Sequence, residues 1–252
     1  MSDIRHLAEA PTETRVLSPG DEVDLHHHDD AQLIYASTGV LELLVATGTW
    51  FTPPTRAVWV PGGTAHRWQV HGMTTVHLVG VSARRGAERA ATDALGASPA
   101  LVLVSPLVRE LILACSENGP PQTLTERRML DVLVDQIRPA PEPATMLPVL
   151  RDPRLRDAQA LVEADLADSP SLPELARRVG ASERTLSRLF HDEVGMTFTV
   201  WRTQLRLHRA NLLLAEGATV THTAMACGYS SPSAFIQAFR AAFGRTPGSV
   251  YR

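Results

Sequence analysis

The sequence lacks lysine altogether and has only two cysteines. Every fixed cation is therefore an arginine, whose planar guanidinium can donate paired hydrogen bonds to a phosphate or to guanine. Cys115 and Cys227 lie far apart and without C-x-x-C spacing, which excludes a zinc finger and a disulfide-rich scaffold. No apolar run approaches the roughly 18 residues of a membrane span, and the N-terminus lacks a basic segment followed by an apolar run. These absences predict a soluble, cytoplasmic protein with no membrane partner.

Length and charge distribution indicate two domains. The chain has 252 residues and 44% apolar content, enough for two hydrophobic cores. Residues 152–252 hold 12 arginines against 10 acids, whereas residues 1–151 hold 12 against 17. Seven arginines and only three acids lie between Arg177 and Arg209. This concentration of positive charge favours a nucleic-acid partner for the C-terminal part.

A helical pattern occurs twice in residues 171–252. Its positions in the two copies are Ala176, Gly180, Leu186, Phe190, Gly195 and Thr197, then Ala224, Gly228, Phe235, Phe239, Gly244 and Thr246. A short helix, a glycine turn and a second helix with apolar residues at i and i+4 predict a helix-turn-helix unit. The alanines suit a close helix crossing, and the glycines suit the positive φ of a helix end. Ser182 and Ser231 are the expected N-caps of the second helices.

The repeat resembles the C-terminal double helix-turn-helix domain of AraC/XylS-type transcription regulators, over about residues 154–252. The most specific match is the closing run Gly228-Tyr229-Ser230-Ser231, Phe235, Phe239, Phe243-Gly244-Arg245-Thr246-Pro247 and Tyr251-Arg252. One departure is Thr223, where the family usually has isoleucine. The resemblance implies that both units, joined by one helix from about Phe198 to Ala215, bind double-stranded DNA in successive major grooves about 34 Å apart.

The helical period predicts which side chains face the DNA. In the two units they are Glu183, Arg184, Ser187 and Arg188, then Ser233, Ile236, Gln237 and Arg240. Arg184 and Arg188 can each pair with guanine, Gln237 can pair with adenine, and Ile236 can contact a thymine methyl. The alternative for any single arginine is a phosphate contact, which carries no sequence information.

Residues 1–82 predict a small all-β barrel. The expected strands are Leu33–Tyr35, Leu41–Val45, Ala57–Val60, Arg67–Val70 and Val76–Val81, bounded by Gly, Pro, Thr and Asp. Two stretches resemble cupin motifs, namely Gly20-x5-His26-x-His28-x3-Gln32-x6-Gly39 and Pro61-x-Gly63-x2-His66. The sequence departs from these motifs at three positions. Gln32 stands where metal-binding cupins usually have glutamate, Thr55 replaces the first glycine of the second motif, and Val70 replaces its last asparagine.

Two kinds of ligand are open for this domain. His26 and His28 share one face of a strand, so with His66 and the Gln32 amide they can hold a divalent transition metal such as Zn, Ni or Fe. The alternative is that these are hydrogen-bonded histidines retained from a cupin ancestor. An organic effector is the second kind, for which the candidate pocket residues are Tyr35, Trp50, Trp59 and Trp68. The same aromatic side chains would also serve simply to fill the core.

The remaining segments complete an α+β multidomain fold. Residues 83–138 are expected to be helical, over Leu107–Cys115 and Leu124–Ile137. A proline-rich linker, 139–151, follows, and the DNA-binding domain is 152–252. In the family the helical region commonly dimerises, so a homodimer through residues 101–138 is expected; packing of the stripe Leu107, Leu111, Cys115 against the barrel is the alternative.

The predicted function is sequence-specific transcription regulation, with a cupin-like sensor that controls a double helix-turn-helix domain. Within the family this arrangement resembles regulators of neighbouring efflux transporter genes, and an activator would also contact RNA polymerase. A metal or small effector would change how the DNA-binding domains of a dimer are placed. The alternative from another class is a metal-dependent cupin enzyme with a helical tail. The lack of a carboxylate ligand and of an evident acid or base argues against an enzyme.

Overall fold

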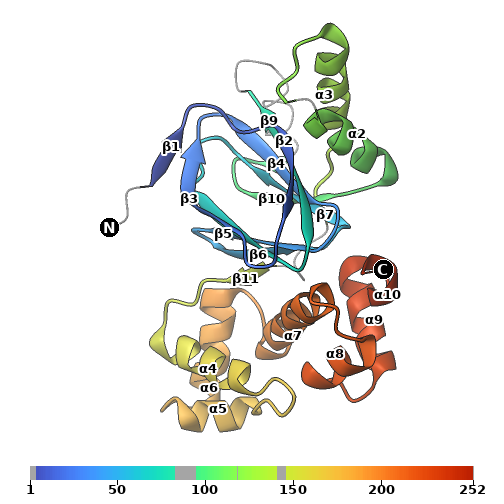
Figure 1. The fold of residues 1–252 in the computed structure, drawn as a ribbon. Helices are drawn as coiled ribbons and strands as arrows, with labels where there is room; N and C mark the ends of the chain where they lie inside the picture. The colour runs from blue at the N-terminus through green and yellow to red at the C-terminus, as the bar shows by residue number, and fades with distance from the viewer. Residues whose placement is uncertain (1–3, 83–94, 118, 141–145, 252) are drawn as a thin grey trace. The chain divides into compact units, whose positions relative to one another are not determined.

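The computed structural model describes residues 4–82, 95–117, 119–140 and 146–251, which form two compact units (Figure 1). The first unit consists of strands followed by two helices, and the second is almost wholly helical. The predicted order of a β domain, helices and an all-α double helix-turn-helix domain is confirmed. In the described ranges, no helix has both the length and the apolar character required to cross a membrane.

The strands of the first unit form two sheets. One sheet contains, in order, β1 (Arg5–Leu7), β3 (Glu22–His28), β8 (His66–His71), β5 (Val40–Val45) and β6 (Gly48–Thr52). The other has the order β10 (Ala100–Leu103), β7 (Arg56–Val60), β4 (Ala31–Ala36), β9 (Thr74–Val81) and β2 (Glu13–Leu17). The five expected strands lie within β4, β5, β7, β8 and β9. The expected β-barrel domain is built from these two separate sheets and is not closed into one continuous sheet; the consecutive strands β1 and β2 are edge strands of different sheets.

The second sheet is buried on both of its faces. Alternate residues of a strand point to opposite faces. On β4, Ile34 therefore packs in the core between the sheets, whereas Leu33 and Tyr35 pack beneath the helices. Those helices are α2 (Pro106–Glu117) and α3 (Leu124–Gln136), which lie against this sheet in Figure 1.

Helices α2 and α3 confirm the helices expected in this region. A capping box starts α3, because the Thr123 side chain accepts from the Glu126 amide while the Glu126 carboxylate accepts from the Thr123 amide. Residues 83–94 of the expected helical segment and 141–145 of the expected linker lie outside the described residues.

The second unit contains the helical repeat. After β11 (Met146–Pro148), its elements are α4 (Pro153–Ala164), α5 (Leu172–Arg178), α6 (Glu183–Leu189), the π-helical η1 (Phe190–Val194), α7 (Phe198–Ala215), α8 (Val220–Ala226), α9 (Pro232–Phe243) and α10 (Pro247–Val250). Helix α4 ends at Ala164, and the residue that follows it, Asp165, adopts an extended conformation. The linking helix α7 has the expected bounds.

Candidate DNA interface and metal site

Each helix-turn-helix unit is built by the same local signals. Gly180 ends the first helix with φ +68°, and Gly228 does so in the second unit with φ +72°. The Ser182 hydroxyl accepts from the Thr185 amide at 3.1 Å at the start of α6. At the start of α9 the Ser231 hydroxyl accepts from the Ala234 amide at 3.2 Å. The second helix of each unit, α6 and α9, therefore begins after the N-cap serine that the sequence predicts.

The predicted DNA-facing side chains lie on the outer faces of α6 and α9. The exposed ones are Glu183, Arg184, Ser187, Arg188, Ser233, Gln237 and Arg240, while Ile236 is half-buried. The opposite faces are inserted into the core, where Leu186 and Phe190 of the first unit and Phe235 and Phe239 of the second are fully buried. The same helix thus uses one face for folding and leaves the other free to contact DNA.

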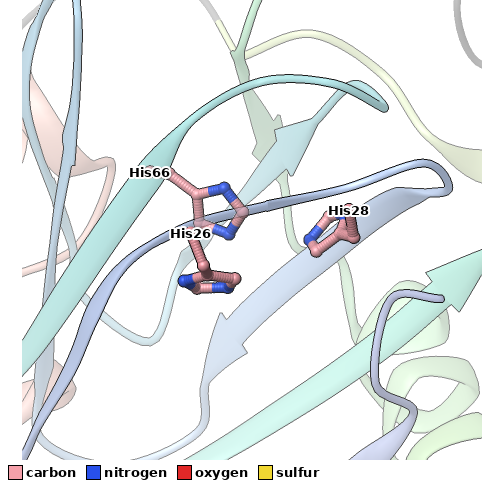
Figure 2. Close-up of side chains that lie close together, drawn as sticks. All are labelled: His26, His28 and His66. Atoms are coloured by element: carbon pink, nitrogen blue, oxygen red, sulfur yellow. The ribbon is translucent and has the colours of Figure 1, made fainter. Parts of the chain in front are cut away.

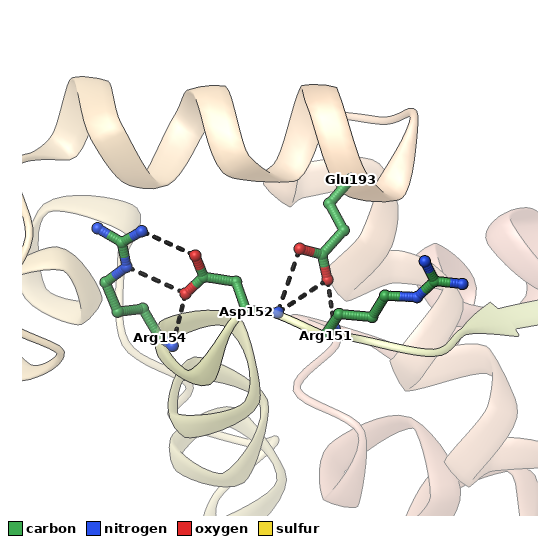
Figure 3. A network of polar contacts seen from close by, with 4 residues as sticks. All are labelled: Arg151, Asp152, Arg154 and Glu193. Carbon is green, nitrogen blue, oxygen red and sulfur yellow. Dashed lines mark hydrogen bonds and ion pairs between the residues drawn. The ribbon is translucent and has the colours of Figure 1, made fainter.

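A polar network that the sequence did not predict lies at the C-terminal end of α6, the second helix of the first helix-turn-helix unit (Figure 3). Glu193 lies in η1, directly after α6, and its carboxylate accepts from the Arg151 and Asp152 amides, the latter at 3.1 Å. Asp152 in turn caps α4 by accepting from the Arg154 amide at 2.9 Å. Hydrogen bonding from Arg154 lowers the pKa of Asp152 to about 2. Glu193 therefore joins the beginning of α4 to the end of α6. The adjacent acidic residues Asp192 and Glu193 in η1 are the sequence signal for it.

Three histidines converge in the first unit, as predicted. His26 and His28 lie on β3 and His66 on β8, where His26 and His66 are register partners. Ring centroids are 4.3 Å apart for His26 and His66, 5.0 Å for His28 and His66, and 5.9 Å for His26 and His28 (Figure 2). One ring nitrogen from each lies within 4.8 Å of the others, and all three side chains are buried.

Backbone carbonyls determine the tautomer of all three rings. The Nδ1 atoms of His26, His28 and His66 lie 2.8, 2.5 and 2.9 Å from the carbonyl oxygens of residues 24, 30 and 64. A carbonyl can only accept, so each Nδ1 carries a proton, and in the neutral form of each ring Nε2 presents a lone pair. Burial lowers the pKa of His66 to about 4 and also lowers the pKa of His26, which keeps both rings neutral at pH 7. Three imidazoles oriented in this way by backbone carbonyls could serve as the donor set of a transition-metal site.

Gln32 completes this group. Its side-chain nitrogen donates to the Pro11 carbonyl at 3.1 Å, which turns its oxygen toward the His28 Nε2, 3.3 Å away. His66 Nε2 has no hydrogen-bond partner in the part of the chain that the structure describes. The amide oxygen of Gln32 and the Nε2 atoms of the neutral rings can therefore all act as acceptors.

An open cavity of about 1230 Å³ adjoins His26. Its walls include His26, Gln32 and Trp68, together with Arg5 and Arg15. Of the four aromatic residues predicted to line a pocket, Trp68 does so.

The other three lie elsewhere. Tyr35 and Trp59 pack in the core beneath α2 and α3, and Trp50 packs against the core between the sheets. Trp50 packs against the same core as Trp68, whereas Tyr35 and Trp59 lie on the opposite face of the second sheet. The reason is that β4 and β7 are buried on both faces, so a large side chain on them need not face the cavity.

Comparison with known proteins agrees with the helical repeat. The model of a helix-turn-helix domain family matches residues 175–252. The HTH-type transcriptional regulator NimR of Escherichia coli is 33% identical over 226 residues, which cover 89% of this chain and 80% of that protein. The chain belongs to the AraC family of transcriptional regulators. It is a DNA-binding regulator, and the similarity to NimR extends through the β domain.

Further relatives match about two fifths of the chain. RipA of Corynebacterium glutamicum is 38% identical over 105 residues, which cover 42% of this chain and 31% of that protein. A solved AraC-type DNA-binding domain protein from Chromobacterium violaceum is 34% identical, with a TM-score of 0.38, and the match covers 39% of this chain and 89% of that one. Since the named relatives are regulators, the comparisons favour a regulator over the alternative of a cupin enzyme.

A fourth buried histidine, His77, lies outside the three-histidine cluster and was not predicted from the sequence. His77 on β9 lies 3.0 Å from the Ser116 hydroxyl of α2 and 3.1 Å from the Thr14 hydroxyl of β2. Burial, with a smaller effect of Arg109, lowers its pKa. This network joins the β domain to α2. No motif marks His77, since its partners are separated from it by 39 and 63 residues.

Proposed function

We propose that this AraC-family regulator binds one divalent transition metal through His26, His28 and His66, and that the metal controls its DNA binding. The observation that carries the proposal is the convergence of three buried Nε2 lone pairs whose tautomers are set by backbone carbonyls. Zn, Ni and Fe each suit imidazole ligands.

The short distance between His28 Nε2 and the Gln32 side-chain oxygen supports the presence of a cation between these two atoms. Two acceptors 3.3 Å apart repel each other unless a cation, either a proton or a metal ion, compensates them. The two further imidazoles directed to the same region favour a metal over a proton. The Gln32 oxygen is a fourth ligand that lies close enough to take part.

Elemental analysis of the untagged protein tests the metal site. We expect about one metal ion per chain, with loss of the metal in His66→Ala. His27→Ala is the matched control: His27 lies between two of the proposed ligands on β3, but its side chain points to the other face of the sheet. Metal-free wild-type protein after exposure to Zn, Ni and Fe salts, or equal metal in His66→Ala, would refute the site.

For the DNA-binding unit we propose that α6 and α9 enter successive major grooves. Arg184, Arg188 and Gln237 are the base-contacting residues, supported by their exposure on the outer faces of helices whose inner faces are buried. Footprinting on the DNA upstream of the gene should show two protected segments about one helical turn apart. Protection of a single segment would contradict the arrangement.

The remaining expectations concern partners. Residues 101–138 are proposed to form a homodimer. On α2, Leu107 is exposed, whereas Leu111 and Cys115 pack against the β domain, so Leu107 is the part of the predicted stripe left for a partner. We also propose that a small effector binds in the cavity. The target is proposed to be a neighbouring efflux transporter gene, and the regulator would contact RNA polymerase if it activates transcription. Sedimentation of wild-type and Leu107→Asp protein tests the dimer: dissociation is expected, and an unchanged dimer would place the interface elsewhere.

A further inference from the structure

The proposed metal site contains no negative charge. Its ligands would be three neutral imidazoles and the neutral amide of Gln32. Among the described residues, no carboxylate belongs to the group of ligand atoms that lie within 4.8 Å of one another. A divalent ion here would keep its full charge in a site where all three histidines are at most 4% exposed. An uncompensated buried charge is costly, so a counter-anion would be strongly attracted.

Charged side chains of both signs line the cavity, among them Glu9, Glu13, Glu22 and Asp24, and Arg5 is the cation placed beside His26. Arg5 on β1 and His26 on β3 are register partners in adjacent strands, so their side chains project from the same face of the sheet. Arg15 lies further along the same cavity, where it pairs with Glu13.

The cavity gives an anion access to the site. His26 and Gln32 form part of its wall, so a molecule inside it reaches two of the four proposed ligands directly. Apolar side chains, among them Trp68 and Leu78, line the same cavity and suit the hydrocarbon part of an organic molecule.

We infer that the effector of this protein is a small organic carboxylate that binds the metal in place of the missing glutamate, with Arg5 beside it. The inference rests on the proposed metal site. The carboxylate would displace water from the metal and neutralise part of its charge, while the organic group occupies the apolar part of the cavity. Binding of the effector thus requires both the metal and the neutral side chain at position 32.

Visible spectroscopy of the Co²⁺-loaded full-length protein tests this inference. The probes are sodium acetate and sodium oxalate, with acetamide as the neutral counterpart of acetate and sodium chloride as the control for ionic strength. We expect acetate and oxalate to change the Co²⁺ absorption bands saturably and acetamide to leave them unchanged. Gln32→Glu should still bind Co²⁺ but bind acetate about tenfold more weakly or worse, since its own carboxylate supplies the charge. Arg5→Ala should weaken acetate binding with Co²⁺ uptake retained.

The possible failures are distinguishable. Co²⁺ uptake without any response to acetate or oxalate, or an equal response to acetamide, would overturn the carboxylate inference and leave the metal site intact. Undiminished acetate binding by Gln32→Glu, in a variant whose circular dichroism matches the wild type, would also overturn it. Absence of Co²⁺ uptake by the wild-type protein would refute the metal site and the inference together.

Discussion

Two glycines at equivalent turns of the helix-turn-helix repeat should respond differently to the same substitution. Gly180 and Gly228 have nearly the same φ, +68° and +72°, and each follows its buried alanine by four residues. A Cβ atom at Gly180 would meet nothing within 4 Å. At Gly228 it would lie 2.3 Å from the Leu166 carbonyl oxygen and 2.6 Å from the Arg206 guanidinium.

The difference in destabilisation between Gly180→Ala and Gly228→Ala isolates the effect of the close contacts at position 228. Placing alanine in the left-handed region costs roughly 1–2 kcal/mol at either position. At Gly228 the Leu166 carbonyl is backbone and cannot rotate away, so overpacking adds about 1–3 kcal/mol. Gly180→Ala should therefore destabilise the DNA-binding unit by about 1–2 kcal/mol and Gly228→Ala by about 2–5 kcal/mol. Arg206 also donates to the Ser169 hydroxyl at 3.2 Å, so the same clash would disturb how the two helix-turn-helix units meet.

Calorimetry of the full-length chain measures the thermal unfolding transitions of both variants. The transition that Gly180→Ala shifts is assigned to the DNA-binding unit. Two domains need not unfold in a single step, so each transition is compared with its own wild-type counterpart. Equal shifts in the two variants would show that the approach of Leu166 to Gly228 contributes nothing, and would refute the reasoning.

Three further predictions concern single side chains. Arg188→Ala should cost about 1–3 kcal/mol at one base step, measured by fluorescence anisotropy on single-base variants of the bound site; uniform weakening would assign Arg188 to the phosphates. Thr223→Val should stabilise the DNA-binding unit by about 1 kcal/mol in calorimetry, because the Thr223 hydroxyl is buried without a hydrogen-bond partner in the described residues; destabilisation would show that the hydroxyl is satisfied. His77→Gln should flatten the pH dependence of urea unfolding between about pH 7.5 and 5.

The sign of the His77 effect follows from burial. In the folded chain the pKa of His77 lies below its ordinary value of 6.5, so the unfolded chain binds more protons as the pH falls. The stability associated with neutral His77 is fully present above pH 6.5 and decreases as the pH falls toward the lowered pKa of the folded state. A variant with the same pH dependence as the wild type would contradict this.

The helical repeat was predictable because its signals are local. Caps such as Ser182 and Ser231, and turns such as Gly180, act within a few residues of where they stand. The β domain depends on pairing between distant strands, which composition and alternation do not specify. The convergence of His66 with the two histidines of β3 was predictable only through the cupin resemblance.

Two other features of the β domain could not be predicted from the sequence, because they depend on contacts between distant segments. The positions of Tyr35 and Trp59 could not be assigned, because strands buried on both faces give no polar alternation to show which face meets the cavity. The partners of His77 come from β2 and α2, which are distant in sequence.

The central claim is that a metal in the three-histidine site controls DNA binding. Its most direct test compares metal-free and metal-reloaded wild-type protein with His66→Ala for binding to the upstream DNA, by anisotropy and footprinting. We expect the metal to change the affinity by about tenfold or to alter the footprint in the wild type, within the usual range of coupling between two sites, and to do neither in His66→Ala. Identical DNA binding by the metal-free and reloaded wild-type protein would contradict the account.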